Sequence, residues 1–325
     1  MTEWVQTQGR KVVVDYGALW ILVIVIGFFS FSSSSFLSYS NLSDILRSIS
    51  IVSLLAIGVT FSLIIDGLDL SVGSIASLST IVAAYCLIVL RQELLITLLL
   101  PIIFGIVIGC INGLFITKGK LADLLVTLAM MYVVNGIQLT ITKGSSIYEG
   151  MSINNKVVTG HFIPSFLYIG QGSIMNIPVA VIIMGVCVIG THIFLEKTTY
   201  GRTFFLIGGN KQAAYLSALP VDRYRIYAYM ISGFFAALAG IVLASRVGTG
   251  QVSAGSPLLM DSITAAYIGI ALFGKGKPNV IGTFLGACLM GILLNGFTML
   301  NVPYYSQDII KGILLIGAIL LAKRN

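Results

Sequence analysis

Long apolar runs, separated by short polar segments, are the feature that most limits what this chain can fold into. Several runs reach about 20 residues, the length that crosses a bilayer as a helix. Backbone groups in lipid must bond within the protein, so these runs predict helices, and the alternating pattern of a membrane β-barrel does not occur. Only 10% of the residues are charged, against about 25% in a soluble domain. The sequence therefore predicts an all-α integral membrane protein with a single transmembrane domain over 1–325.

The apolar runs predict about ten membrane spans. The expected spans are 17–36, 51–65, 74–90, 94–116, 121–141, 177–195, 226–245, 260–274, 279–299 and 307–322. An amphipathic piece at 40–50 precedes the second span, and the short spans 51–65 and 260–274 also fit re-entrant segments. Helix–break–helix units at 51–90 and 260–299 resemble the irregular backbone that transporters place along a cavity.

The positions of the lysines and arginines predict the orientation, because cytoplasmic loops carry an excess of both. With a cytoplasmic N-terminus and ten alternating spans, 13 of the 19 basic residues lie inside. The others are Arg47, Arg91, Lys143, Lys156, Arg246 and Lys311. Both termini and segment 196–225 are then cytoplasmic, and 142–176 is outside. This distribution also explains the net charge of +7 without binding to nucleic acid.

Segment 196–225 is the largest polar insertion on the basic side. It contains five basic residues, Lys197, Arg202, Lys211, Arg223 and Arg225. Within it, GGNKQAAYLSA predicts a turn followed by a short helix that Pro220 would end. A basic, helix-forming insertion of this size indicates a surface for a cytoplasmic partner.

Two aspartates, Asp66 and Asp69, lie in the polar break IIDGLDLSVGS. A carboxylate at the centre of a membrane helix costs about 2.5–3.5 kcal/mol, so both are expected to face protein, water or a helix N-terminus. Asp69 and Ser71 directly precede an apolar span, where either can cap free backbone N–H groups. Capping is the favoured interpretation here and for Asp261, while a direct part in a transport pathway stays open for Asp66 and Asp69.

Nothing in the sequence indicates catalysis. GxxxxGK occurs from Gly269 to Lys275, but a phosphate-binding loop needs Ser or Thr next, and Gly276 follows. His161 and His192 have no second ligand at metal spacing, so no metal, bound cofactor or catalytic residue is expected. A secondary transporter is the main alternative on composition, but ion-coupled carriers do not need a polar insertion of this kind.

Four segments form a specific pattern. They are GLDLSVGSIASLS (67–79), YGRTFFLIGGNKQAAYLSALPVDRYRI (200–226), and the regions 233–283 and 294–321. The first is similar to GIDLSVG and the second to GRxxxAxGGNxxAAxxSGI, two signatures of the permease subunits of bacterial ABC importers for ribose and related simple sugars. The chain resembles this family from about residue 45 to its end.

The resemblance implies a type II importer fold in the bacterial inner membrane. It also implies a second permease subunit, identical or different, and an extracytoplasmic sugar-binding protein. Cytoplasmic ATPase subunits would bind ATP and Mg²⁺, while this chain would bind no cofactor and hydrolyse nothing. Permeases for branched-chain amino acids or for an autoinducer-type sugar derivative are the alternatives within this class.

By the same resemblance, segment 209–218 is the coupling helix that rests in a cleft of the ATPase. The coupling candidates are Gly208, Gly209, Asn210, Lys211, Gln212, Ala213, Ala214, Leu216 and Ser217. Lys211 and Ala218 stand where the family often has Glu and Gly. The candidates for a weakly polar sugar pathway are Thr60, Asp66, Asp69, Ser71, Asn135, Gln138 and Asn295. For Asn135 and Asn295, hydrogen bonds between helices are the favoured alternative.

Overall fold

The structure is a computed structural model that describes residues 20–153, 156–273 and 276–324. Its helices are 20–32, α2 (Tyr39–Ile64), α3 (Val72–Ile88), α4 (Leu94–Thr117), α5 (Asp123–Thr142), α6 (Pro164–Gln171), α7 (Val179–Lys197), α8 (Thr199–Gly209), α9 (Lys211–Leu216), α10 (Val221–Val247), α11 (Ser256–Leu272), α12 (Val280–Met299) and α13 (Tyr304–Arg324). Two small antiparallel hairpins pair β1 (Ser152–Ile153) with β2 (Lys156–Val157) and β3 (Ser173–Ile174) with β4 (Ile177–Pro178).

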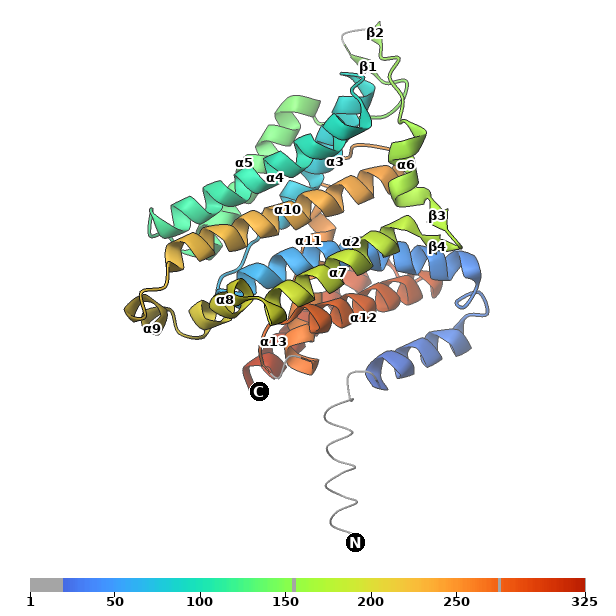
Figure 1. The fold of residues 1–325 in the computed structure, drawn as a ribbon. Helices are drawn as coiled ribbons and strands as arrows, with labels where there is room; N and C mark the ends of the chain where they lie inside the picture. The colour runs from blue at the N-terminus through green and yellow to red at the C-terminus, as the bar shows by residue number, and fades with distance from the viewer. Residues whose placement is uncertain (1–19, 154–155, 274–275, 325) are drawn as a thin grey trace.

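The helices form one bundle whose two ends differ (Figure 1). One end carries α6 and the hairpins, and the opposite end carries α8, α9 and the C-terminus. Among the described residues, seven helices are long and apolar enough to cross a membrane, and three shorter apolar helices accompany them. The expected all-α membrane fold is therefore confirmed, whereas the number of about ten crossings stays a prediction.

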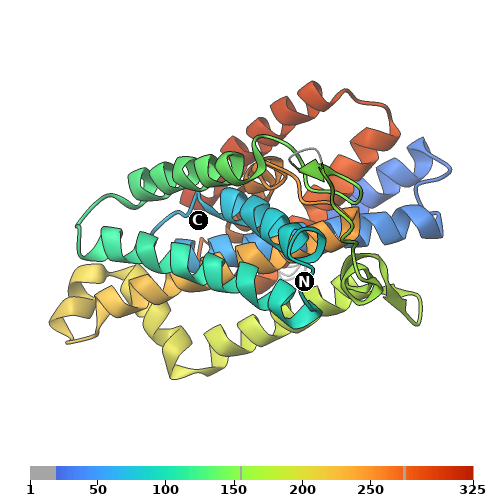
Figure 2. The same cartoon turned by 90° about the horizontal axis from the view of Figure 1, so that it is seen from above.

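The bundle is built around α2 and α10, which are the most buried of the long helices. Both pass through the middle of the bundle in Figure 2. Both have long apolar stretches, as expected for helices surrounded by others, and carry their charged residues near their ends. α10 packs closely on α4 at three glycines spaced by four residues, Gly105, Gly109 and Gly113. A Cβ at Gly113 would lie 2.7 Å from the Cα of Ile226, so the two backbones touch without intervening side chains.

Two sequence predictions about helix boundaries are wrong. The amphipathic piece at 40–50 and the short span at 51–65 are one continuous helix of 26 residues, α2. Its polar residues are paired by distant segments, since Arg47 donates to the carbonyl oxygen of Gln171 at 2.8 Å. The spans expected to end at 195 and to begin at 226 are longer, because α7 continues to Lys197 and α10 begins at Val221, with α8 and α9 between them.

The local prediction for GGNKQAAYLSA is confirmed. Asn210 forms the turn, and its side chain accepts a hydrogen bond from the backbone N–H of Ala213 at 2.9 Å at the start of α9. The helix ends at Leu216, four residues before Pro220, which instead caps α10. Ala218 between them has a φ of 58°, a left-handed conformation that favours glycine.

Two capping predictions are also wrong. Asp261 lies inside α11 rather than before it, with its carboxylate 2.9 Å from the Lys311 ammonium of α13. Ser71 makes no side-chain cap at the start of α3, because its hydroxyl donates to Asp69 instead. Asp69 accepts one backbone N–H, that of Ser71, at 2.9 Å.

Candidate functional site

The α8–α9 segment forms an exposed surface at one end of the bundle (Figure 1). Of the residues expected to couple to a partner, Lys211, Gln212, Ala213 and Ser217 are exposed. Leu216 is 89% exposed. Ala214 faces inward and packs with Ile207 and Val221 in a small apolar cluster.

Side-chain contacts hold α9 to the start of α10. The Tyr215 hydroxyl donates to the carboxylate of Asp222, in the first turn of α10. This hydrogen bond raises the pKa of the Tyr215 phenol, with smaller contributions from burial and from the Asp222 charge. Together with the cluster around Ala214, it makes α9 and the start of α10 one unit.

Gly208 places the segment directly against α2. A Cβ at this position would overlap the carbonyl group of Ile64, the last residue of α2. Gly209, in contrast, has no atom within 4 Å of its Cβ position. Only the first of the two glycines is therefore required for close packing.

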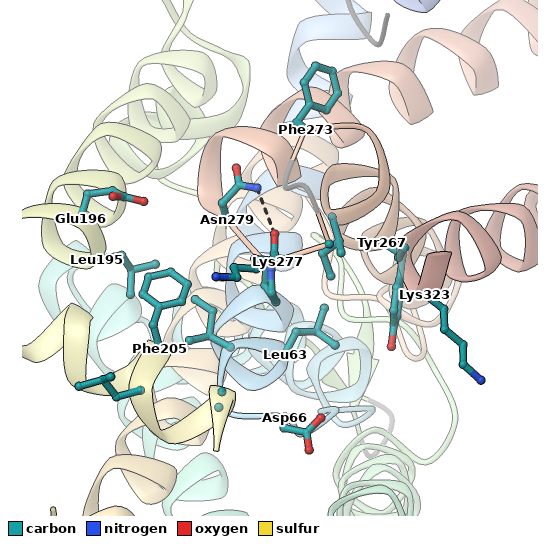
Figure 3. Close-up of a pocket in the computed structure, with 18 of the residues that line it drawn as sticks. Leu63, Asp66, Leu195, Glu196, Phe205, Tyr267, Phe273, Lys277, Asn279 and Lys323 are labelled. Atoms are coloured by element: carbon teal, nitrogen blue, oxygen red, sulfur yellow. Dashed lines mark hydrogen bonds between the residues drawn. The ribbon is translucent and has the colours of Figure 1, made fainter. Parts of the chain in front are cut away.

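A cavity of about 1090 Å³ opens beside this contact (Figure 3). Its walls come from the ends of α2, α7, α8, α11 and α13 and from the segment before α12. Leu195, Glu196 and Phe205 lie on one side of it, and Tyr267 and Lys323 on the other (Figure 3). Of the residues predicted from the sequence, the cavity brings together Gly208, Gly209 and Asp66.

The cavity has apolar walls and a charged rim. Leucine, isoleucine and phenylalanine side chains form most of the walls, and the rim residues are Asp66, Glu196, Arg202, Lys277 and Lys323. Within the described part of the chain, these five exposed side chains form no ion pair with one another. Asp66 has a φ of 59°, so the end of α2 turns sharply at the cavity.

The break between α2 and α3 is a buried polar core rather than a loop in solvent. The Asp69 side chain is fully buried, and Ser71 (2.6 Å) and Ser232 of α10 (2.8 Å) donate their hydroxyls to it. Asn112 of α4 donates to the Ser71 hydroxyl at 2.9 Å. Burial raises the pKa of the Asp69 carboxyl, and the hydrogen bonds oppose this shift without cancelling it. Through these uncharged hydroxyl and amide groups, the GLDLSVG segment connects the start of α3 with α4 and α10.

Next to this core lies an ion pair that sequence reasoning missed. Arg225 of α10 donates to both carboxylate oxygens of Asp123, in the first turn of α5, at 2.6 and 2.7 Å. Tyr229 donates to the same carboxylate at 2.6 Å. Gly67 packs on this group, since its Cβ would lie 2.5 Å from both the Asp123 carboxylate and the Tyr229 hydroxyl. The only sequence signal was an acidic residue beginning one apolar run and a basic residue beginning another.

The other pathway candidates lie apart from the cavity and bond within the bundle. Thr60 of α2 shares a hydrogen bond with Thr283 of α12 at 2.7 Å. Gln138 of α5 donates to the carbonyl oxygen of Ser74 at 3.0 Å and to Asn135 at 3.2 Å. Asn295 and Asn41 form a reciprocal amide pair at 2.9 and 3.1 Å. Asn295 thus makes the hydrogen bond between helices that the sequence favoured, whereas the printed partner of Asn135 lies on its own helix.

Ranges 20–153, 156–273 and 276–324 contain no group of three His, Cys, Asp or Glu side chains that could hold a metal ion. What these ranges do contain is a polytopic helical bundle with an exposed helical segment, a cavity and a buried polar core at one end. Such a protein is a multi-pass membrane protein.

Comparison with known proteins identifies the family. Residues 41–319 match the family described as branched-chain amino acid transport system / permease component. The chain belongs to this family of permeases.

Several curated relatives are similar over nearly the whole chain. The ribose import permease protein RbsC of Bacillus subtilis is 35% identical over 100% of this chain and 99% of its own length. RbsC of Haemophilus influenzae is 34% identical, with 92% and 90% covered. The xylose transport system permease protein XylH of Escherichia coli is 29% identical, with 92% and 88% covered. No solved structure gives a significant match. The resemblance to permeases of sugar importers is confirmed.

Proposed function

We propose that this chain is the transmembrane permease subunit of an ABC importer that moves a monosaccharide, ribose or a related simple sugar, into the cytoplasm. One observation carries the proposal. The exposed α8–α9 segment rests through Gly208 on the end of α2, beside the cavity and the buried GLDLSVG segment. A partner that moves α9 would therefore act directly on the transmembrane helices.

The partner we propose at α9 is a separate ATPase subunit that binds ATP and Mg²⁺. This chain carries no catalytic residue in the proposal and binds no cofactor. Lys211, Gln212, Ala213, Leu216 and Ser217 supply the docking surface, while Gly208, Asn210 and Ala214 shape it. Lys211 offers a positive charge to the ATPase, so the partner's cleft would be acidic at that point.

Charge supports the proposed orientation in a bacterial inner membrane. The end of the bundle with α8 and α9 carries Lys118, Lys120, Lys197, Arg202, Lys211, Arg223, Arg225, Lys277 and Lys323. An excess of basic residues marks the cytoplasmic side. The end with α6 and the hairpins would face outward and receive a sugar-binding protein, with a second permease subunit completing the pathway.

The pathway would alternate between outward and inward access. A sugar has no charge, so weakly polar side chains suffice for it, and Asp66, Asp69, Ser71, Thr60, Asn135, Gln138 and Asn295 remain our candidates. The family description and the relatives differ in the solutes they name, because the family model refers to branched-chain amino acids and the relatives to ribose and xylose. The 35% identity over the full chain favours a sugar.

The test is reconstitution in nanodiscs with the candidate ATPase and binding protein. We expect ATP hydrolysis to rise when the binding protein is loaded with D-ribose or D-xylose, and not with leucine. In vesicles, uptake of the sugar should require ATP and all three components. Uptake by this chain alone, without ATP, would refute the importer and indicate a secondary transporter.

A further inference from the structure

Four polar residues of α10 lie on one face of the helix and connect different parts of the protein. Asp222, Arg225, Tyr229 and Ser232 are spaced by three, four and three residues, which places them in one stripe. Asp222 accepts a hydrogen bond from Tyr215 of α9. Arg225 and Tyr229 both donate to Asp123 of α5. Ser232 donates to Asp69 in the GLDLSVG segment. One face of one helix thus connects the docking surface with α5 and with the buried core.

The first connection is stiff. Tyr215 bonds to Asp222 and Ala214 packs on Val221, so α9 cannot move without the start of α10. The second connection is an ion pair in which one guanidinium nitrogen of Arg225 contacts both carboxylate oxygens of Asp123. Both groups are buried or nearly buried, since the Arg225 side chain is 8% exposed and that of Asp123 18%. The same carboxylate also accepts a hydrogen bond from the Tyr229 hydroxyl, so two side chains of α10 hold it in place.

The helix at the other side of this ion pair is held loosely by packing. Within α5 only Val126, Thr127, Val134 and Gln138 are buried. Polar contacts hold both of its ends instead. At one end, Asp123 bonds to α10 and Thr127 donates to the carbonyl oxygen of Leu68 at 3.1 Å. At the other end, Gln138 donates to the carbonyl oxygen of Ser74. Because few apolar contacts resist its movement, α5 should follow the groups that grip its ends.

We propose that Arg225 and Tyr229 are positioning residues that transmit movement of α9 to α5. The inference rests on the proposed function, in which an ATPase moves α9. α5 carries two pathway candidates, Asn135 and Gln138. The contacts of Arg225 and Tyr229 with Asp123 therefore connect the surface proposed to bind the ATPase with the helix that would shape the pathway. The GLDLSVG segment moves with it, because Gly67 packs on the Asp123–Tyr229 contact.

Two conservative variants and one matched control test this role in the reconstituted complex. Arg225→Lys keeps the charge on a shorter side chain that reaches less far towards Asp123, and Tyr229→Phe removes one hydroxyl. Tyr227→Phe removes a hydroxyl from the same helix that has no hydrogen bond among the described residues. The measurements are thermal unfolding, affinity for the ATPase, and sugar transported per ATP hydrolysed.

We expect Arg225→Lys to reduce sugar transported per ATP about fivefold or more, the lower range of coupling between distinct sites. Tyr229→Phe should have a smaller effect in the same direction, and Tyr227→Phe none. Affinity for the ATPase should stay at the wild-type value in all three. If stability, ATPase affinity and transport fall together while sugar per ATP is unchanged, the residues only support the fold and the inference is wrong.

A second measurement does not depend on the solute. Spin labels at the exposed positions Leu125 of α5 and Tyr227 of α10 report the distance between these helices with and without ATP. In the wild type this distance should stay constant, because the helices move together, and in Arg225→Lys it should change or broaden. An ATP-dependent change in the wild type would overturn the inference even if the transported solute is not a sugar. An ATPase that hydrolyses ATP but never binds α9 would refute the proposed function and this inference with it.

Discussion

Replacing Gly208 with alanine tests the contact on which the proposed coupling depends. The new Cβ would lie 2.8 Å from the carbonyl carbon of Ile64, and the carbonyl oxygen is closer still. Ordinary van der Waals contact begins at 3.4 Å. Clearing the carbonyl carbon alone takes about 0.6 Å and clearing the oxygen takes more, and backbone cannot rotate away as a side chain can.

The expected loss follows from the usual cost of overpacking. Adding one methyl group to a tightly packed contact destabilises a protein by about 1–3 kcal/mol. We expect Gly208→Ala to lower the melting temperature of the chain in nanodiscs. If α8 moves away instead, the loss should appear as a weaker affinity for the ATPase, in the range of about 5- to 150-fold that corresponds to the same free energy.

Gly209→Ala is the matched variant for the steric argument. Nothing lies within 4 Å of its Cβ position, and removing a glycine from a helix end restricts the unfolded chain, a gain of about 0.4–1 kcal/mol. Its melting temperature should therefore equal or exceed that of the wild type. Equal melting temperatures for the two alanine variants, with equal ATPase affinity, would refute the packing we describe at Gly208.

Three further predictions concern single groups and use thermal unfolding in nanodiscs. Asp69→Asn should change stability by less than about 1 kcal/mol, because the amide can keep the hydrogen bonds. Asp69→Leu should cost about 2 kcal/mol or more, because it leaves buried donors unpaired. Equal stability of the two variants would contradict this prediction. Lys311→Ala should cost about 3–5 kcal/mol because it leaves the buried Asp261 carboxylate without its partner, and exchanging the two residues should recover part of the loss. Ala218→Gly should stabilise the chain by up to about 1 kcal/mol by relieving a left-handed conformation, and a lower melting temperature would show that this position is not strained.

The short-range features of the chain were predictable because their causes lie within a few residues. Asn210 caps the helix that follows it, and the sequence GGNKQAAYLSA contains both the turn and the helix. Apolar runs likewise predicted the helical membrane fold, since lipid permits few other structures. The same local signals predicted the short helix α9, which the structure shows to be mostly exposed.

Contacts between distant segments were not predictable. Asp261 was assigned to a helix cap because it stands near the start of an apolar run, but its partner is Lys311, 50 positions further along the chain. The polar start of α2 suggested a separate piece because Gln171, which pairs with Arg47, lies 124 positions away along the chain. Arg225 and Asp123 gave no signal beyond a charge at the start of an apolar run, although they form an ion pair next to the buried polar core. In each case the sequence showed a charged residue but not the distant residue that pairs with it.

The glycine contact between α4 and α10 determines where this protein can deform. Side chains between helices act as a compliant layer, because rotamer changes absorb small shifts. At Gly105, Gly109 and Gly113 there is no such layer, and sliding by one residue would drive Cβ atoms into the facing backbone. α4 and α10 must then move together as one rigid unit. Any change in the shape of the molecule then has to involve helices with few buried side chains, such as α5 and α13.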